Sequence, residues 1–133
     1  MTYEEMLREA FRRWNAGDFE GAEEFLHPEI EWHTSGRFPD LEPVYRGLDG
    51  VVRFWETFTA PWEEIVLEPR ELTVAGDQVI VEGGFRARGR DGIEVELVMF
   101  QRYAGRHGKI VLSETYRTRA AAFEAAGIEE PAS

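Results

Sequence analysis

The sequence has no cysteine among its 133 residues. This absence excludes a disulfide framework, a thiolate zinc site and a cysteine nucleophile. The three histidines, His27, His33 and His107, are scattered and include no pair at the i, i+4 spacing that would place two ligands on one helix face. The sequence therefore predicts no metal site, and we expect no cofactor.

Long apolar runs are also absent. The N-terminal stretch MTYEEMLREAF is acidic and amphipathic, with neither the basic start nor the unbroken apolar segment of a signal peptide. No segment has the roughly 20 apolar residues that a membrane-spanning helix needs. These features predict a cytoplasmic protein without a membrane span.

Basic residues are scarce. Lysine and arginine together number 15 against 26 aspartates and glutamates, so the formal net charge is -11, and Lys109 is the only lysine. A surface this acidic repels phosphate backbones, which argues against nucleic acid and anionic membranes as partners. Its ordinary consequence is solubility.

Linkers, repeats and low-complexity stretches are lacking, so we interpret residues 1–133 as a single domain. Hydrophobic residues make up 43% and aromatic residues 13% of the chain, which is typical of a globular protein. A chain of this length can bury a core without a disulfide or a metal to hold it.

Capping residues and helical spacing of apolar residues predict four helices. The first begins at Tyr3 behind a capping box formed by Thr2 and Glu5, and it ends at Gly17. The others are expected at 18–26, 48–59 and 119–126.

Alternating apolar and polar residues predict strands around 30–34, 64–74, 79–88, 94–102 and 109–117, separated by glycine-rich turns and by a loop at 35–47. Helices that precede a run of strands indicate an α+β fold with an antiparallel or mixed sheet packed on helices. Twist and an irregularity at Pro69 should curl the sheet around the N-terminal helices. A curled sheet of this kind encloses an internal pocket.

Three stretches carry a family resemblance: WNAGDFEGAEEFLHPEIEW, VYRGLDGVVRFW and SETYRTRAAAFEAAG. Together they resemble the SnoaL-like branch of the NTF2-like (ketosteroid isomerase-like) superfamily over nearly the whole chain. The resemblance implies a cone-shaped fold with an internal pocket. It does not imply one activity, because the superfamily includes isomerases, polyketide cyclases, epoxide hydrolases, dehydratases and non-catalytic carriers.

The catalytic groups of two superfamily activities are missing. The resemblance places the base of the steroid isomerases at Thr34 and their oxyanion-binding groups at Ala10 and Met99, none of which suits its role. The epoxide hydrolases need an Asp-Arg-Asp set, and the stretch ELVMFQRY offers no suitable Arg and Asp pair. We therefore expect neither activity.

Glu114 is the candidate catalytic residue. The apolar pattern groups it with Ile110 and Leu112, which predicts that it faces the pocket and has a raised pKa suited to an acid or base. The resemblance implies the opposite register, with Ser113 and Thr115 lining the pocket and Glu114 outside. A shift of one residue exchanges the two faces of a strand, so both registers stay open.

Aromatic residues supply the candidate ligand-binding surface. We expect the pocket to be lined by Trp14, Trp32, Thr34, Tyr45, Trp55, Phe58, Phe85 and Met99. Tyr45 should enter from the loop beside the pocket mouth, where Arg37 and Asp40 would form part of a lid. His33 alternates with inward-facing Trp32 and is interpreted as a surface residue.

Two function hypotheses follow. The favoured one is a small-molecule-binding protein that takes an apolar ligand and has no assigned activity. The alternative is an isomerase, cyclase or hydrolase acting on a small polyketide- or terpenoid-like substrate through Glu114, Tyr45 and Thr34. A carboxylate or histidine inside the cavity, with a second polar group in hydrogen-bond reach, distinguishes the enzyme from the binding protein.

A homodimer is expected as well. Members of the family commonly pair sheet to sheet, and the outward face of the long strands carries Val98 and Phe100 among charged residues. The resemblance therefore implies a mixed apolar and polar interface.

Overall fold

The computed structural model describes residues 1–34 and 40–131. In these ranges the elements, in chain order, are α1 (Tyr3–Asn15), α2 (Phe19–Glu23), β1 (Leu26–His33), β2 (Val44–Arg46), α3 (Gly47–Thr59), β3 (Trp62–Ala75), β4 (Gln78–Gly89), β5 (Glu94–Arg106), β6 (Lys109–Tyr116) and α4 (Arg119–Ala126). The α+β class is confirmed.

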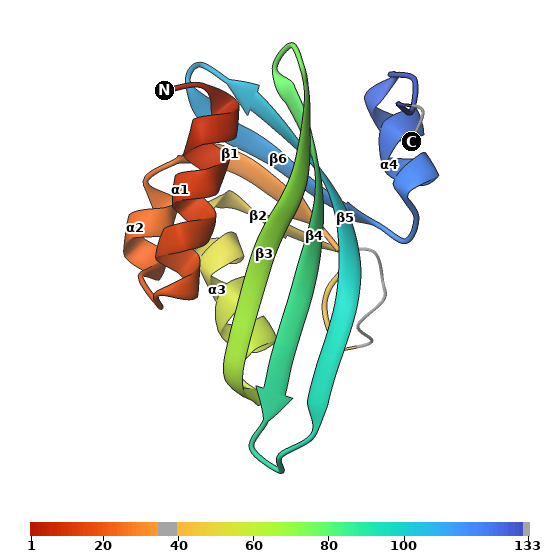
Figure 1. The fold of residues 1–133 in the computed structure, drawn as a ribbon. Helices are drawn as coiled ribbons and strands as arrows, with labels where there is room; N and C mark the ends of the chain where they lie inside the picture. The colour runs from red at the N-terminus through yellow and green to blue at the C-terminus, as the bar shows by residue number, and fades with distance from the viewer. Residues whose placement is uncertain (35–39, 132–133) are drawn as a thin grey trace.

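The strands form one curved, mixed sheet in the order β2-β1-β6-β5-β4-β3. Strands β1 and β6 pair in parallel, and the other neighbours are antiparallel. Figure 1 shows the long strands β3, β4 and β5 running lengthwise while β6, β1 and β2 cross behind them at an angle. The expected irregularity is present, since the register of β3 against β4 shifts between Pro69 and Glu71.

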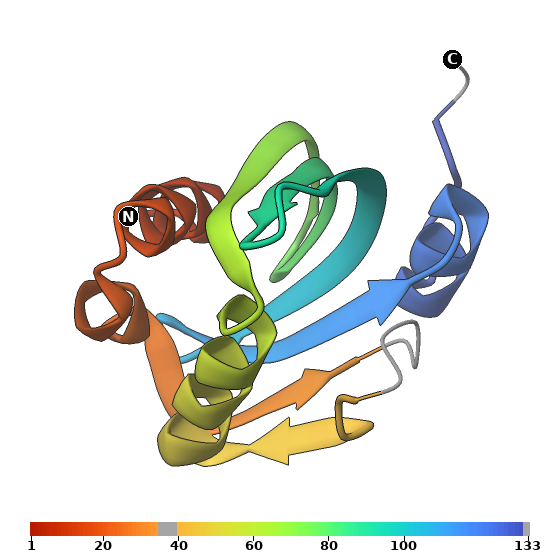
Figure 2. The same cartoon turned by 90° about the horizontal axis from the view of Figure 1, so that it is seen from below.

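Helices cover both faces of the sheet. Helices α1, α2 and α3 lie on the concave side, and α4 lies on the other side of the sheet (Figure 2). Their apolar residues form two separate clusters, because Val79 and Val81 of β4 pack with the concave-side core whereas Ile80 packs against α4. The larger cluster contains the cavity described below.

Local signals placed the helix ends well. The capping box of Thr2 and Glu5 is present, Thr118 caps α4, and Gly127 ends α4 in the left-handed conformation. The predicted second helix was too long, because α2 ends at Glu23 and β1 already begins at Leu26. Leu26 pairs with Ile110 of β6, and this long-range pairing keeps the chain extended through the His-Pro step.

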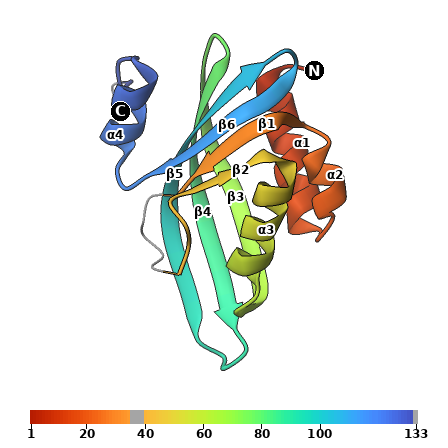
Figure 3. The ribbon, with the colours of Figure 1, turned by 180° about the vertical axis from the view of Figure 1, so that it is seen from behind.

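The loop predicted at 35–47 contains a short strand. Residues Val44–Arg46 form β2 and pair with Glu31–His33 of β1, and Figure 3 shows them at the sheet edge beside α3. Three residues are too few for an alternation signal, and the pairing partner lies outside the local sequence. Arg37 lies outside the described residues, and Asp40 is exposed.

Asn15 explains the break between the first two helices. Its side-chain amide donates to the Leu67 carbonyl (2.8 Å) and accepts from the Leu67 amide (2.9 Å), so it pairs with the free edge of β3 as a strand would. Gly17 then takes a φ of 80°, which favours glycine, and Asp18 caps α2 through the Gly21 amide. The N-x-G-D stretch thus joins the helical layer to the sheet edge.

Candidate ligand cavity

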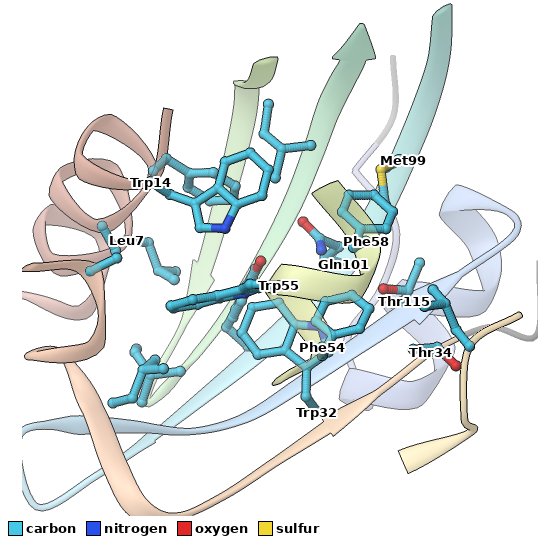
Figure 4. Close-up of a pocket in the computed structure, with 18 residues that line it drawn as sticks. Leu7, Trp14, Trp32, Thr34, Phe54, Trp55, Phe58, Met99, Gln101 and Thr115 are labelled. Carbon is cyan, nitrogen blue, oxygen red and sulfur yellow. The ribbon is translucent and has the colours of Figure 1, made fainter. Parts of the chain in front are cut away.

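The concave side of the sheet borders a partly open cavity of about 70 Å³. Its walls come from α1, α2, α3 and the inward faces of β1, β3, β5 and β6, with Thr34 and Leu41 from the segment between β1 and β2. The lining residues, drawn in Figure 4, are Leu7, Ala10, Phe11, Trp14, Ala22, Leu26, Trp32, Thr34, Leu41, Phe54, Trp55, Phe58, Leu67, Met99, Gln101, Tyr103, Ile110 and Thr115.

The lining is chemically uniform. Among the described residues that line it there is no aspartate, glutamate, histidine, lysine or arginine. Thr34, Gln101 and Thr115 supply polar groups, and Tyr103 is the one phenol of this set. Burial raises the pKa of Tyr103 well above the ordinary value, although the Ser113 hydroxyl opposes this shift. Tyr103 therefore stays protonated at neutral pH and can serve only as a hydrogen-bonding group.

The free volume limits the size of a guest. One buried water requires about 10–15 Å³, so the cavity holds about five water-sized groups. Rings pack closely around it, since Trp32 lies 5.6 Å from Phe54 and 5.9 Å from Trp55 between centroids. A guest with several fused rings would require these side chains to move.

Most of the residues expected from the sequence border this space. They are Trp14, Trp32, Thr34, Trp55, Phe58 and Met99. The hydroxyl of Thr34 is already used, because it donates to the Glu42 carbonyl at 2.7 Å. Whether these side chains contact a ligand stays a prediction.

Two of the expected residues lie elsewhere. The Tyr45 ring is buried on β2 against Phe54 (5.1 Å between centroids), and its hydroxyl accepts from the Glu42 amide at 3.0 Å. Phe85 is fully buried behind the cavity, between Phe58 and Trp62. Both are core residues, because the pairing of β2 with β1 and the depth of β4 in the sheet place them in solid packing.

The register of the last strand excludes Glu114 from the cavity. Ala104 of β5 pairs with Leu112 and Gly105 pairs with Ile110, so Val111 is an extra residue in β6. Ile110 faces the cavity before this bulge, and Thr115 faces it afterwards. The apolar pattern that grouped Glu114 with Ile110 was therefore wrong, because it assumed unbroken alternation.

Glu114 instead belongs to a polar network on the outer face. It accepts hydrogen bonds from Arg102 and from the Tyr116 hydroxyl. Arg102 also donates to Gln78 (2.8 Å), and Gln78 donates to the Ala126 carbonyl of α4 (3.1 Å). The network thus connects three strands to the last helix, which is a structural role.

The bonds of this network set the ionisation of Glu114. Burial by itself raises the pKa of Glu114, but hydrogen bonds from Tyr116 and Arg102 outweigh it and hold the pKa below the ordinary value. The carboxylate is therefore ionised and paired at neutral pH, which does not suit a general acid. His33 also lies on the outer face, where its Nε2 is 3.0 Å from Glu31.

Gln101 is the cavity residue whose importance the sequence pattern did not reveal. The alternation placed it in an inward row with Val95, Leu97 and Met99, and the structure agrees, since Gln101 lines the cavity and is buried. The signal that could have identified it is an amide side chain at the end of an otherwise apolar row. Thr115, directly opposite on β6, was expected at the pocket from the family resemblance, and it does line the cavity.

Two further findings concern other kinds of site. The described residues contain no group of three or more His, Cys, Asp or Glu side chains that could hold a metal ion. None of the described helices is long and apolar enough to cross a membrane.

Comparison with known proteins places the chain among similar folds. A family model, the SnoaL-like domain, matches residues 7–113. No curated protein matches the sequence.

Three solved structures illustrate the likeness. TerC, co-crystallised with polyporic acid, is 24% identical over 90% of this chain and 94% of its own, with a TM-score of 0.78. A protein of ketosteroid isomerase-like fold from Catenulispora acidiphila, in complex with trimethylamine, is 12% identical over 97% and 96%, with a TM-score of 0.74. A putative SnoaL-like polyketide cyclase from Mesorhizobium loti is 20% identical over 87% and 99%, with a TM-score of 0.66. At these identities the likeness concerns the fold.

Proposed function

The chain belongs to the SnoaL-like domain family, and on this premise we propose that it binds one small, uncharged, largely apolar organic molecule in the cavity. One observation carries the proposal: no described lining residue bears a charge at neutral pH. An ion buried there would lose its hydration without gaining a partner, at a cost of several kcal/mol, whereas an apolar molecule gains about 25 cal/mol for each Å² removed from water.

The similar structures support a small organic guest without identifying it. TerC was crystallised with polyporic acid and the Catenulispora acidiphila protein with trimethylamine, which are chemically unlike each other. The ligand class must therefore come from the lining of this chain's own cavity.

The enzyme hypothesis lacks the group it requires. Proton transfer at neutral pH needs a side chain with a pKa near 7, such as a histidine or a shifted carboxyl group. The polar groups of the described lining are the amide of Gln101, the indole N–H groups, and the hydroxyls of Thr34, Thr115 and Tyr103, none of which takes a proton at that pH. We therefore propose a binding protein rather than an acid–base enzyme.

Mass spectrometry of compounds released on denaturation tests the proposal. We expect an uncharged small molecule in near-stoichiometric amount from the wild-type protein and little from Ala10→Leu. Ala10 lines the cavity from α1, and three added carbons would fill much of the free space.

The matched control is Ala120→Leu, the same substitution on the exposed face of α4, which should release as much compound as the wild type. Equal release from Ala10→Leu and Ala120→Leu would show that the compound binds elsewhere. A charged compound retained by the wild type and lost in Ala10→Leu would contradict the proposed ligand class.

We also propose that the chain forms a homodimer through the outer sheet face, as the family resemblance implies. Helix α4 packs over Phe100, so the interface would involve the parts of β4 and β5 that α4 does not cover. Light scattering after size exclusion should give twice the mass of the chain, and a mass of 15.3 kDa would contradict the dimer.

The cytoplasmic location stays a prediction.

A further inference from the structure

The sequence has two glutamines, and the structure places them on opposite faces of the sheet. Gln78 lies on the outer face, where its amide is satisfied at both ends by Arg102 and by the Ala126 carbonyl. Gln101 lies on the inner face and points into the cavity (Figure 4). The two residues therefore have the same type of side chain, but their hydrogen-bonding environments differ.

The Gln101 amide is open to a hydrogen-bond partner in the cavity. Gln101 is 8% exposed, and no hydrogen bond joins its amide to another residue of 1–34 or 40–131, although the amide borders the cavity and is not fully enclosed, unlike Ser113 Oγ. A mostly buried amide is stabilised by a hydrogen-bond partner. Because the side chain borders free space, the missing partner can be a guest molecule.

Thr115 places a second polar group beside Gln101. The two residues are directly opposite each other on β5 and β6, an arrangement that brings Cβ atoms within about 4.5–5.5 Å. Both line the cavity, and the Thr115 hydroxyl, like the Gln101 amide, has no hydrogen-bond partner in the described part of the chain. The hydroxyl of Thr34, by contrast, already has its acceptor in Glu42.

We propose that Gln101 and Thr115 form a polar subsite that binds one uncharged carbonyl or hydroxyl oxygen of an otherwise hydrocarbon ligand. This inference rests on the proposed function and specifies its ligand class. The amide N–H₂ and the threonine O–H donate to the ligand oxygen, and the amide oxygen accepts from a ligand hydroxyl. The remaining walls, formed by tryptophan, phenylalanine and leucine side chains, contact the hydrocarbon part.

Charge and size further restrict which molecules the cavity can bind. A carboxylate would lie in the cavity without a cationic partner, which its desolvation opposes. The free volume of about 70 Å³ suits a molecule of about five to seven non-hydrogen atoms without rearrangement of the rings. Cyclopentanone therefore serves as a probe, and methylenecyclopentane serves as its isosteric hydrocarbon.

The test is an NMR titration of the tryptophan indole N–H signals, since Trp14, Trp32 and Trp55 border the cavity. The measured quantity is the Kd of methylenecyclopentane divided by that of cyclopentanone. Replacing the amide by Gln101→Met should lower this ratio about tenfold, because one hydrogen bond to a buried partner is lost for the ketone alone. Thr115→Val should also lower this Kd ratio. Cyclobutanecarboxylate should not bind to the wild-type protein.

Melting temperatures provide an independent readout that needs no ligand. Gln101→Met should raise the Tm of the empty protein by about 2–6 °C, because a mostly buried amide that no described residue pairs is replaced by an apolar side chain. Gln78→Met, the same substitution at the satisfied glutamine, should lower the Tm and leave the Kd ratio unchanged.

The outcomes separate the two proposals. The polar subsite would be overturned if both probes bind and the Kd ratio is unchanged in Gln101→Met and Thr115→Val. A lowered Tm in Gln101→Met would also overturn it. Either result would leave the binding function intact. Tight binding of cyclobutanecarboxylate would overturn the uncharged ligand class. If no probe shifts the indole signals of the wild-type protein, the binding function itself fails.

Discussion

Replacing Phe85 by alanine is expected to lower the free energy of unfolding by about 3–5 kcal/mol, the range for removing a large aromatic side chain from a packed core. The Phe85 side chain is 0% exposed, and its ring centroid lies 5.4 Å from that of Phe58 and 6.0 Å from that of Trp62. Phe85 itself does not border the cavity, so its removal leaves a new hole in the packed core. The loss is measured by urea unfolding at constant m-value.

Phe25→Ala is the matched control for this prediction. Phe25 lies outside the main core, with the Arg13 guanidinium 4.8 Å above its ring, and part of it is accessible to solvent. The same atoms are removed, but less apolar surface leaves the interior, so the loss should be clearly smaller. A similar loss at both positions would show that Phe85 is not in solid packing, and its assignment as a cavity residue would then regain support.

The second large effect is expected at Arg102. Replacing it by methionine should lower the free energy of unfolding by about 2–3 kcal/mol, somewhat less than for breaking a fully buried ion pair. The Arg102 and Glu114 side chains are 17% and 23% exposed, so solvent screens part of the interaction. The substitution leaves the Glu114 carboxylate half-buried, with Tyr116 as its remaining donor among the described residues, and it removes the donor to Gln78.

A double-mutant cycle identifies the pair as the cause. Glu114→Gln alone should also destabilise the protein. The double variant should lose less free energy of unfolding than the sum of the two single variants' losses. The exposed pair of Arg8 and Glu4 on α1 is the control, because its removal should change stability little. Additive effects of Arg102→Met and Glu114→Gln would show that the two side chains do not stabilise each other.

The same pair predicts a pH dependence. The folded-state pKa of Glu114 lies below its ordinary value of 4.5, so the ionised carboxylate contributes stability that is present above that value and lost as the pH falls through the folded-state pKa. The stability difference between wild type and Glu114→Gln should therefore shrink between pH 7 and pH 3. A constant difference over this interval would contradict the pairing of the ionised form.

Short-range signals in the sequence determined most of the elements of this protein. The capping box at Thr2, the αL glycine at 127 and the alternation in β4 each depend on a few neighbouring residues, so the pattern and the structure agree. The uncharged lining was also predictable in part, because inward rows are apolar by pattern. Hence the fold, the cavity and six of its lining residues follow from the sequence pattern and the family resemblance.

Only the tertiary structure decided where the polar groups lie. The parallel pairing of β1 with β6, the short strand β2 that buries Tyr45, and the extra residue at Val111 all depend on partners distant in sequence. Tyr3 of α1 packs directly on Gly105, where an added Cβ would collide with the ring, and the register shift occurs at this point. One inserted residue exchanges the two faces of a strand, and this is why Glu114 belongs to an outer network while Thr115 lies beside Gln101 on the cavity wall.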